Sequence, residues 1–385
     1  MAKLTPTKLS ISNSSEVGNS SVNTTVLPRE ISFNEENLVS VIAYSCLFIV
    51  AAVGNLTVFI TLFRNRQRRS RVNLFIMHLS IADLIVTFVM LPLETAWHIT
   101  VAWKAGDVAC RTLMFCRAFG FYLSSFILVT ISLDRYWAIA HPLSLCDADK
   151  RGRIMLTIAW LCSTIASIPQ SVIFHVERHP DYPWFTQCVT FNFFPTNGHE
   201  LAYNLFNLVT VYGIPLVAII VCYSLILCEM SKKYRQSVGK NDFLIAVEST
   251  RDSLGRNCHV MRRSGIGHIE RARIRTLKMT IVIVLVFILC WTPYFFISAW
   301  WWVDRPSAKR VDPKIQRGLF LFAVSNSCMD PIVYGMFTTA FRRQLRRWHK
   351  QFKGQLNGRK RAASLKNPPR YLLAAGGKPH HWFTL

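Results

Sequence analysis

Seven long apolar runs, separated by short polar segments, dominate the pattern along the chain. The runs at 38–63 and 279–303 contain no charged residue. Each exceeds the roughly 20 residues that a helix needs to cross about 30 Å of hydrocarbon. Because backbone polar groups inside lipid must be bonded within their own segment, each run is predicted to be a helix. The predicted fold class is an all-α membrane protein, with spans at 38–63, 73–97, 108–140, 154–174, 200–230, 274–303 and 315–336.

Lysine and arginine gather in the odd-numbered connections and after the last span. The first connection, RNRQRRSR at 64–71, alone holds five arginines. The positive-inside rule places these segments in the cytoplasm and the N-terminus outside the cell, as expected for a multi-pass plasma-membrane protein. The net charge of +24 then lies on one side of the membrane, against anionic lipid. Seven apolar spans argue against nucleic acid as the partner of this basic chain.

The flanks of the spans define the remaining domains. Residues 1–37 are predicted to form an extracellular tail, glycosylated at the N-x-[ST] sites Asn13, Asn19 and Asn23. No apolar stretch before the first span resembles a cleaved signal peptide, so that span is expected to serve as the signal anchor. After the transmembrane domain at 38–336, residues 337–352 fit an amphipathic surface helix, and 353–385 form a basic cytoplasmic tail.

Two of the eleven cysteines stand apart from those within spans. Cys110 lies at the outer start of the third span, and Cys188 lies in the long fourth connection. Both face the oxidising side, which favours a disulfide between them. The alternation of residues around Cys188 is compatible with a short hairpin. No C-x-x-C spacing indicates a metal site.

Placing a charged residue inside a membrane span costs free energy, so the charged residues found there are candidates for functional sites. Glu94 lies on the second span, and Arg117 lies at a similar outer depth on the third. Arg117 and Arg135 are eighteen residues apart, which puts them on one helix face about 27 Å apart. Glu94 and Arg117 are predicted to face one water-filled cavity, where they can form a pair. A structural ion pair that ties the two helices is the alternative interpretation.

A polar cluster is predicted at the centre of the bundle. Hard cations prefer oxygen ligands, so the cluster could hold Na⁺ or ordered waters. A plain hydrogen-bond network fits as well. Pro215, Pro293 and Pro331 each remove a backbone hydrogen bond within a span and are predicted to kink it. The residues of the cluster are Asn55, Asp83, Ser124, Asn326 and Asp330.

Together these positions carry a family resemblance. The chain resembles the rhodopsin-like G-protein-coupled receptors over about residues 38–350, with at least one marker in each span. The markers are Asn55, LSIADL with Asp83, Trp103 before Cys110, the triplet Asp134-Arg135-Tyr136, Trp160, Pro215, Tyr223, CWTP at 290–293 and DPIVY at 330–334.

This resemblance implies a seven-helix bundle that activates a heterotrimeric G protein and is not an enzyme. It supports the Cys110–Cys188 bridge. An ion pair between Asp134 and Arg135 would hold the inactive arrangement, and ligand binding must favour the open arrangement differentially. The residues implied in the switch are Asp134, Arg135, Tyr136, Tyr223, Pro293, Asp330, Pro331 and Tyr334.

A subfamily resemblance follows from the span interiors. The last span lacks an inward lysine, which excludes a retinal Schiff base, and Arg117 stands where aminergic receptors have an aspartate. The chain is similar to the gonadotropin-releasing hormone receptor superfamily. Within it, the chain most resembles the arthropod receptors for adipokinetic hormone, corazonin and the adipokinetic hormone/corazonin-related peptide. Asp330, where asparagine is usual, is shared with the gonadotropin-releasing hormone group. Because Asp83 is acidic too, one carboxyl could be protonated, which argues against simple sodium binding.

The implied ligand is a short peptide blocked by pyroglutamate and a C-terminal amide, on the adipokinetic hormone-like side. A corazonin receptor or a vasopressin-like peptide receptor is the alternative, and a transporter is the alternative outside receptors. Arg117 could donate in bidentate fashion to peptide carbonyls. The implied ligand-binding residues are Glu94, Trp97, His98, Arg117, Asn204, Trp291, Tyr294 and Trp301.

Regulation is indicated only by short basic motifs. RRS at 262–264 and RKRAAS at 359–364 suit basophilic kinases, with Ser264 and Ser364 as the acceptors. Kinases and arrestin are therefore further partners to expect.

Overall fold

Helices that follow the seven apolar runs make up most of the fold. The computed structural model describes residues 32–64, 71–141, 148–252, 266–308 and 310–338. Within them, seven helical segments are long and apolar enough to cross a membrane, which confirms the predicted fold class. The predicted glycosylation sites Asn13, Asn19 and Asn23, the acceptors Ser264 and Ser364, and nearly all of the surface helix at 337–352 lie outside the described residues.

The first four spans differ only slightly from the predicted ranges. The second consists of two α-helices joined by a π-helical turn, η2. The spans are α1 (Glu35–Arg64), α2 (Arg71–Ile85) with η2 (Val86–Met90) and α3 (Leu91–Thr100), α4 (Gly106–Ala140), and α5 (Ala148–Ile173).

A two-stranded antiparallel hairpin and three further spans follow. The hairpin confirms the predicted alternation around Cys188, which pairs with Val176 across the strands. The elements are β1 (His175–Arg178), β2 (Thr186–Val189), α6 (Asn197–Leu208), η3 (Val209–Gly213), α7 (Ile214–Asp252), α8 (Ile266–Val303), α9 (Arg305–Ala308), α10 (Pro313–Val324) and α11 (Asn326–Phe337).

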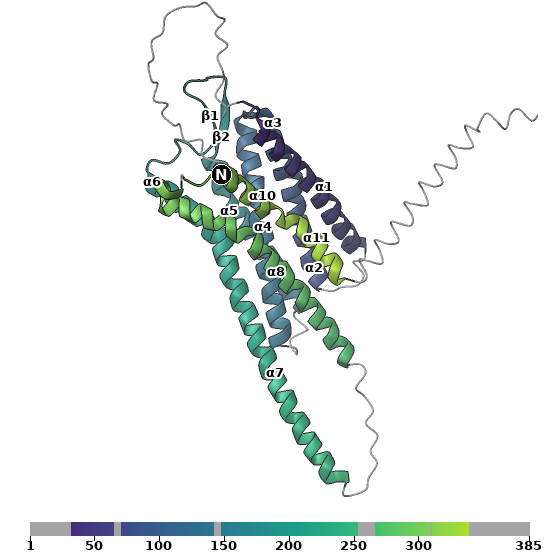
Figure 1. Ribbon diagram of the computed structural model, residues 1–385. Coiled ribbons are helices and arrows are strands. Elements are labelled where there is room, and N and C mark those ends of the chain that lie inside the picture. The colour runs from purple at the N-terminus through teal and green to yellow at the C-terminus, as the bar shows by residue number, and fades with distance from the viewer. Residues whose placement is uncertain (1–31, 65–70, 142–147, 253–265, 309, 339–385) are drawn as a thin grey trace, which may run out of the picture. The chain divides into compact units, whose positions relative to one another are not determined.

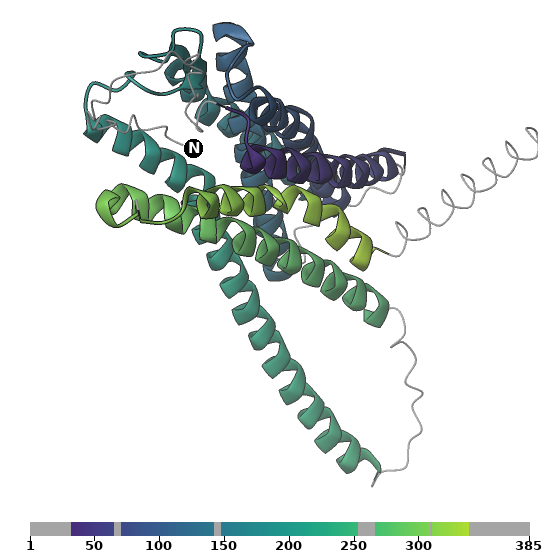
Figure 2. The same cartoon turned by 45° about the horizontal axis from the view of Figure 1, so that its top comes forward.

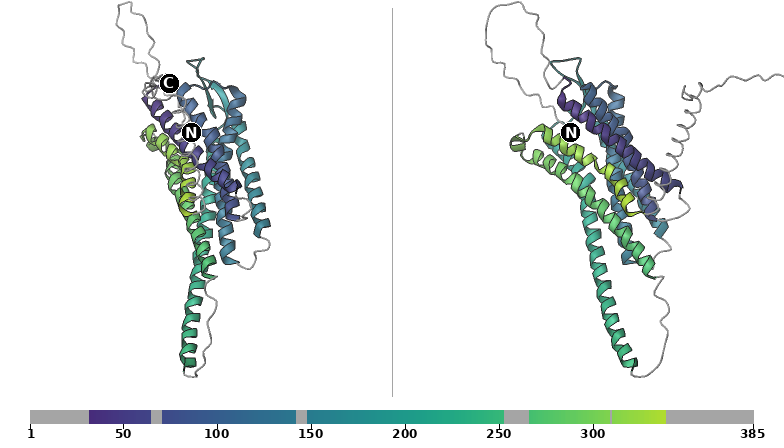
Figure 3. Two further views of the ribbon diagram at one scale, coloured as in Figure 1. Left: turned by 90° about the vertical axis from the view of Figure 1, so that its right-hand side faces the viewer. Right: turned by 45° about the vertical axis from the view of Figure 1, so that its right-hand side comes forward.

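The third span, α4, is the central helix of the bundle. It packs against α2, α5, α7 and α8, while α1 packs against α2, α3 and α11. The hairpin lies near α3 and α6, as Figure 1 shows, and we call this the hairpin end. At the opposite end α7 continues past its neighbours (Figure 2). The two views in Figure 3 agree on this arrangement. A residue on α4 can therefore contact most of the other spans.

The surface and the interior reverse the pattern of a water-soluble protein. Large aliphatic and aromatic side chains such as Ile165, Leu289 and Phe296 are exposed, whereas Asp83, Ser132 and Asp134 are fully buried. Exposed apolar surface of this extent is unfavourable in water but suits hydrocarbon. The polar interior is therefore where functional chemistry is expected.

Breaks in the helices coincide with the polar centre. The seventh span is interrupted at Ser325, between α10 and α11. Pro293 lies inside α8 and Pro331 inside α11, so both helices contain the prolines at which kinks are predicted. Pro215 is the second residue of α7, directly after η3. The two π-helical turns were not predicted, because a single extra residue in a helical turn leaves no clear signature in apolar periodicity.

Gly120 allows α4 to approach η2 closely, which makes it a test of this packing. A Cβ at Gly120 would lie 2.8 Å from Val86 Cγ2 and 3.4 Å from the Val86 backbone nitrogen. Gly120→Ala is therefore expected to destabilise the protein by about 1–3 kcal/mol. Thermal unfolding in detergent measures this. Gly318→Ala is the matched control, because a Cβ there meets nothing within 4 Å. Equal melting temperatures for both variants would contradict the close approach.

Candidate functional site

Glu94 and Arg117 form an ion pair between α3 and α4 towards the hairpin end. Arg117 Nη1 lies 2.9 Å from Glu94 Oε1, and the side chains are 17% and 12% exposed. The guanidinium also lies over the ring of Phe320, with its carbon 5.2 Å from the ring centroid. Arg117 thus contacts an acid on one side and an aromatic face on the other, which leaves donors for a further acceptor.

Aromatic side chains continue from this pair into the bundle. Tyr294 packs on Phe320 with ring centroids 5.2 Å apart. Trp291, one turn deeper in α8, stacks on Phe295 and meets Phe121 edge-on at 5.1 Å. Tyr294 also meets Trp291 edge-on, with ring centroids 6.4 Å apart, so the aromatic side chains on the two sides of Pro293 contact one another.

Trp97 and His98 extend the site to α1 and the hairpin. Trp97 Nε1 donates to Gln187 Oε1 at 2.7 Å. His98 Nδ1 lies 3.2 Å from Asn37 Oδ1, and its ring stacks on Tyr44 at 5.7 Å. Sequence reasoning had included neither Tyr44 nor Gln187, because neither lies at a motif position.

Asn204 and Trp301 are less closely tied to this arrangement. Both are half-buried. In the described part of the chain, no hydrogen bond, ion pair or ring contact joins either of them to Glu94 or Arg117. One turn after Asn204, Asn207 Oδ1 accepts from Tyr122 at 2.8 Å and from Gln170 at 3.2 Å. This polar contact among α4, α5 and α6 was missed by sequence reasoning.

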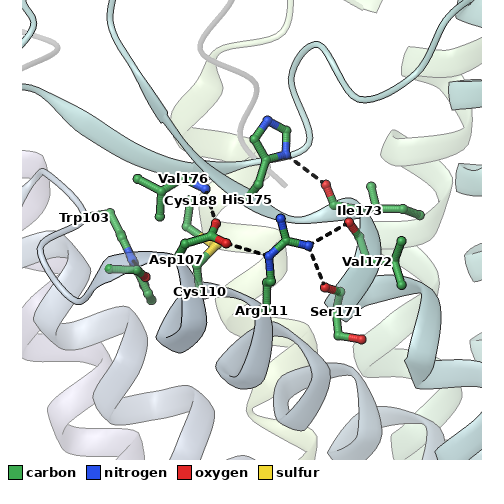
Figure 4. Close-up of polar contacts among 11 residues, drawn as sticks. Trp103, Asp107, Cys110, Arg111, Ser171, Val172, Ile173, His175, Val176 and Cys188 are labelled. Atoms are coloured by element: carbon green, nitrogen blue, oxygen red, sulfur yellow. Dashed lines mark hydrogen bonds and ion pairs between the residues drawn. A yellow bond between two sulfur atoms is a disulfide. The ribbon is translucent and has the colours of Figure 1, made fainter.

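The hairpin is fastened to the helices through both of its strands. Cys110 and Cys188 form the predicted disulfide, with their Cα atoms 5.7 Å apart. Next to it, Thr186 on β2 exchanges hydrogen bonds with the Trp103 backbone, at 2.7 Å and 2.5 Å. On β1, the Val176 amide donates to Asp107 Oδ1 at 2.9 Å (Figure 4). The hairpin is therefore held over the start of α4.

Arg111 links this attachment to α5. Its Nε donates to Asp107 Oδ2 at 2.6 Å, and its Nη1 donates to the Ser171 and Val172 carbonyls at 3.2 Å each (Figure 4). Those carbonyls belong to the last turn of α5, whose carbonyls have no partner within the helix. Asp107 and Arg111 were not predicted, since exposed charges at a helix start have no distinctive spacing.

A further ion-pair cluster joins the first turn of α1 to α10. Glu36 accepts from Arg317, and Lys314 Nζ lies 3.4 Å from Glu36 Oε1. Two cations share one carboxylate there, beside the Asn37–His98 contact. These ion pairs join the first span to the seventh at the hairpin end.

The predicted central cluster is brought together around Asp83. Asn55 Nδ2 donates to the Ser327 carbonyl at 2.8 Å and to the Ala51 carbonyl at 3.1 Å. A small cavity, with room for about one water molecule, is lined by residues that include Asn55, Asp83 and Asp330. The carboxylate oxygens of Asp83 and Asp330, and oxygens of Ser124 and Asn326, are buried without a well-aligned hydrogen bond in the described part of the chain. This all-oxygen set suits water or a hard cation rather than a transition metal.

At the end opposite the hairpin, Asp134 and Arg135 form the predicted ion pair. The Asp134 carboxylate is fully buried, and its other oxygen accepts from Arg71, which sequence reasoning had counted only as part of a basic loop. Tyr136 meets Trp137 edge-on at 6.0 Å. The Tyr223 and Tyr334 side chains point into the protein, with Tyr334 buried beside the Asp83 cavity. Of the implied switch residues, Asp330, Pro331 and Tyr334 therefore line the central cavity, whereas Asp134 and Arg135 pair at this end.

Known proteins share this organisation along most of the chain. Residues 54–334 match the family described as "7 transmembrane receptor (rhodopsin family)". The gonadotropin-releasing hormone II receptor of Clarias gariepinus is 38% identical over 345 residues, covering 88% of this chain and 87% of its own. The corresponding receptor of Chlorocebus aethiops is 38% identical over 301 residues, covering 77% and 75%. The gonadotropin-releasing hormone receptor of Sus scrofa is 33% identical over 302 residues, covering 76% and 86%.

The match and the geometry agree. The family match runs from the first span into the seventh, and the bundle places the disulfide at one end and the Asp134–Arg135 pair at the other. The chain therefore belongs to the rhodopsin family of seven-transmembrane receptors, with gonadotropin-releasing hormone receptors among its relatives.

Proposed function

We propose that the chain is the receptor for a short, terminally blocked peptide of the adipokinetic hormone, corazonin and gonadotropin-releasing hormone type. Membership of the family makes it a receptor of the G-protein-coupled class rather than an enzyme. The hairpin end faces the outside of the cell and binds the peptide, and the opposite end binds the G protein.

The single observation that carries this proposal is the Glu94–Arg117 pair in its aromatic surroundings. A blocked peptide has no terminal charges but many backbone carbonyls. Arg117 has five donors in a planar fork, and one of its nitrogens, Nη1, lies 2.9 Å from Glu94 Oε1 in the ion pair. The remaining donors suit two peptide carbonyls, and the rings of Tyr294, Phe320 and Trp97 offer large contact area for aromatic peptide residues.

Activation follows from the position of Tyr294 and Trp291 on α8. The peptide binds between α3, α4 and α8 and favours a different rotamer or depth of Tyr294. This displaces the part of α8 beyond Pro293, where the missing backbone hydrogen bond makes bending less costly. The opposite end then opens around Arg135 and Tyr223 and admits the G protein. The ligand shifts this equilibrium only as far as it binds the open arrangement more tightly.

A panel of synthetic peptides tests the proposal. Cells that express the full chain are exposed to adipokinetic hormone, corazonin, adipokinetic hormone/corazonin-related peptide, gonadotropin-releasing hormone II and a vasopressin-like peptide, and calcium and cyclic AMP are recorded. A saturable response to one of the first four, strongest for an adipokinetic hormone-like peptide, is expected. A response only to the vasopressin-like peptide, or to none in cells with receptor at the surface, contradicts the proposed ligand class. Antibody access to N-terminal and C-terminal tags on intact cells tests the orientation.

A further inference from the structure

Asp134 is held by two guanidinium groups from different helices. Arg71, the first residue of α2, donates from Nη1 to Asp134 Oδ1 at 2.9 Å. Arg135 uses the other oxygen, Oδ2. The Asp134 side chain is completely buried, whereas that of Arg71 is 17% exposed. In the described part of the chain these are the two side chains that donate hydrogen bonds to this carboxylate.

Because each arginine uses its own oxygen, either one can leave without displacing the other. The removal of one partner from a buried ion pair is costly, since it leaves a charge unpaired in a medium of low polarity. If Arg135 were the only partner, its departure would strand the Asp134 charge. Arg71 provides a partner that does not depend on the position of Arg135.

The surroundings keep Arg71 in place. Its Nε faces Asp149 Oδ1 on α5 at 3.7 Å, and Asp149 is 62% exposed. The Asp149 contact is weak by comparison, because exposed ion pairs contribute little. It nevertheless orients the guanidinium, so that Arg71 joins the starts of α2 and α5 to the end of α4.

We propose that Arg71 is a positioning residue for G-protein coupling, which keeps Asp134 paired while Arg135 turns away to the G protein. This inference rests on the proposed function at the end opposite the hairpin. Arg71 and Arg135 both bind the Asp134 carboxylate. The Asp134–Arg135 pair restrains the receptor in the inactive arrangement, whereas the proposed role of Arg71 favours the active one. An alternative role, as a second lock on the inactive arrangement, predicts the opposite sign when Arg71 is replaced.

The test is GTP exchange by purified heterotrimeric G proteins on the full chain in lipid nanodiscs. Exchange is measured without ligand, and again with the active peptide where the panel identifies one. Arg71→Gln is expected to lower the exchange rate about tenfold, which corresponds to about 1.4 kcal/mol. Arg71→Lys is expected to restore part of it, because an ammonium can still donate to Oδ1. The matched control is Arg64→Gln, which removes an exposed arginine from the last turn of α1.

The Asp134→Asn background distinguishes a positioning role of Arg71 from a purely structural one. With a neutral amide at 134 there is no buried charge to strand, so exchange by Asp134→Asn alone is expected to exceed that of the unmodified chain. Adding Arg71→Gln to Asp134→Asn is then expected to change little. An equal loss in both backgrounds would overturn the proposal, since it would show a structural role only. Unchanged or higher exchange by Arg71→Gln alone would overturn it as well. If no peptide in the panel acts, the proposed ligand fails, but the ligand-free comparison still decides the role of Arg71.

Discussion

Arg117→Gln is expected to lower the potency of the activating peptide by about 10- to 100-fold while the receptor still reaches the cell surface. A hydrogen bond to a charged group contributes about 1.5–3 kcal/mol, and glutamine retains one amide NH2 group but no charge. Arg117 is 17% exposed beside the Phe320 ring, so the loss falls on a side chain that ligand can reach. Dose–response curves, scaled to surface receptor, measure the effect. Lys104→Gln, at an exposed cation between α3 and α4, is the control.

A charge exchange distinguishes ligand binding from a structural tie between α3 and α4. Glu94→Arg combined with Arg117→Glu re-forms the ion pair with its partners reversed. If the pair only joins the helices, the double variant recovers both surface expression and peptide potency. If Arg117 donates to the peptide, the double variant recovers expression but stays weakly responsive. Full recovery of potency would therefore remove the main support for the proposed peptide site.

The spans could be predicted because the membrane imposes one strong rule on sequence. Long apolar runs located all seven helices, and most ends moved by a few polar residues, such as Glu35 and Glu36 at the start of α1. The spans on either side of the fifth connection differ more, because α7 continues to Asp252, well past the predicted end at 230, and α8 begins at Ile266 rather than at 274. The hairpin could also be anticipated from the alternation around Cys188, and the disulfide from the outward-facing positions of Cys110 and Cys188 together with the family resemblance. The spans, the hairpin and the disulfide can be predicted because they depend on the pattern of neighbouring residues and on the side of the membrane that each connection faces.

The partners of individual side chains could not be predicted in the same way. Spacing on one helix fixes which residues share a face, but it does not fix how a neighbouring helix is rotated against that face. Arg71 therefore remained one basic residue among several, although it reaches Asp134, 63 positions away. Asn204 and Asn207 lie one turn apart on α6, so the sequence alone does not distinguish them. In the structure Asn207 makes the polar contacts to α4 and α5. The turn η2, against which Gly120 packs, likewise depends on contacts between helices.

Loss of the Cys110–Cys188 disulfide is the second large effect expected. The bridge closes a sequence separation of 78 residues, and the chain-entropy account gives about 4.5 kcal/mol for a loop of this size. That is a large part of the 5–15 kcal/mol by which folded domains are typically stable. The remaining polar contacts of the hairpin include those to Trp97, Trp103 and Asp107, and each is partly or fully exposed. Cys110→Ser is therefore expected to reduce both surface receptor and peptide binding severely.

Cys110 and Cys188 form a single bond, so replacing either cysteine is expected to have the same effect. Cys188→Ser must match Cys110→Ser, and the double variant must be no worse than either, because each single change already removes the same bond. Cys116→Ser is the control, since Cys116 lies on the same helix and is a free, half-buried thiol. Surface staining, thermal unfolding and radiolabelled-peptide binding give the comparison. Additive losses in the double variant would mean that the two thiols act separately. Normal peptide binding by both single variants would mean that Trp103, Asp107 and Arg111 suffice to hold the hairpin over the site.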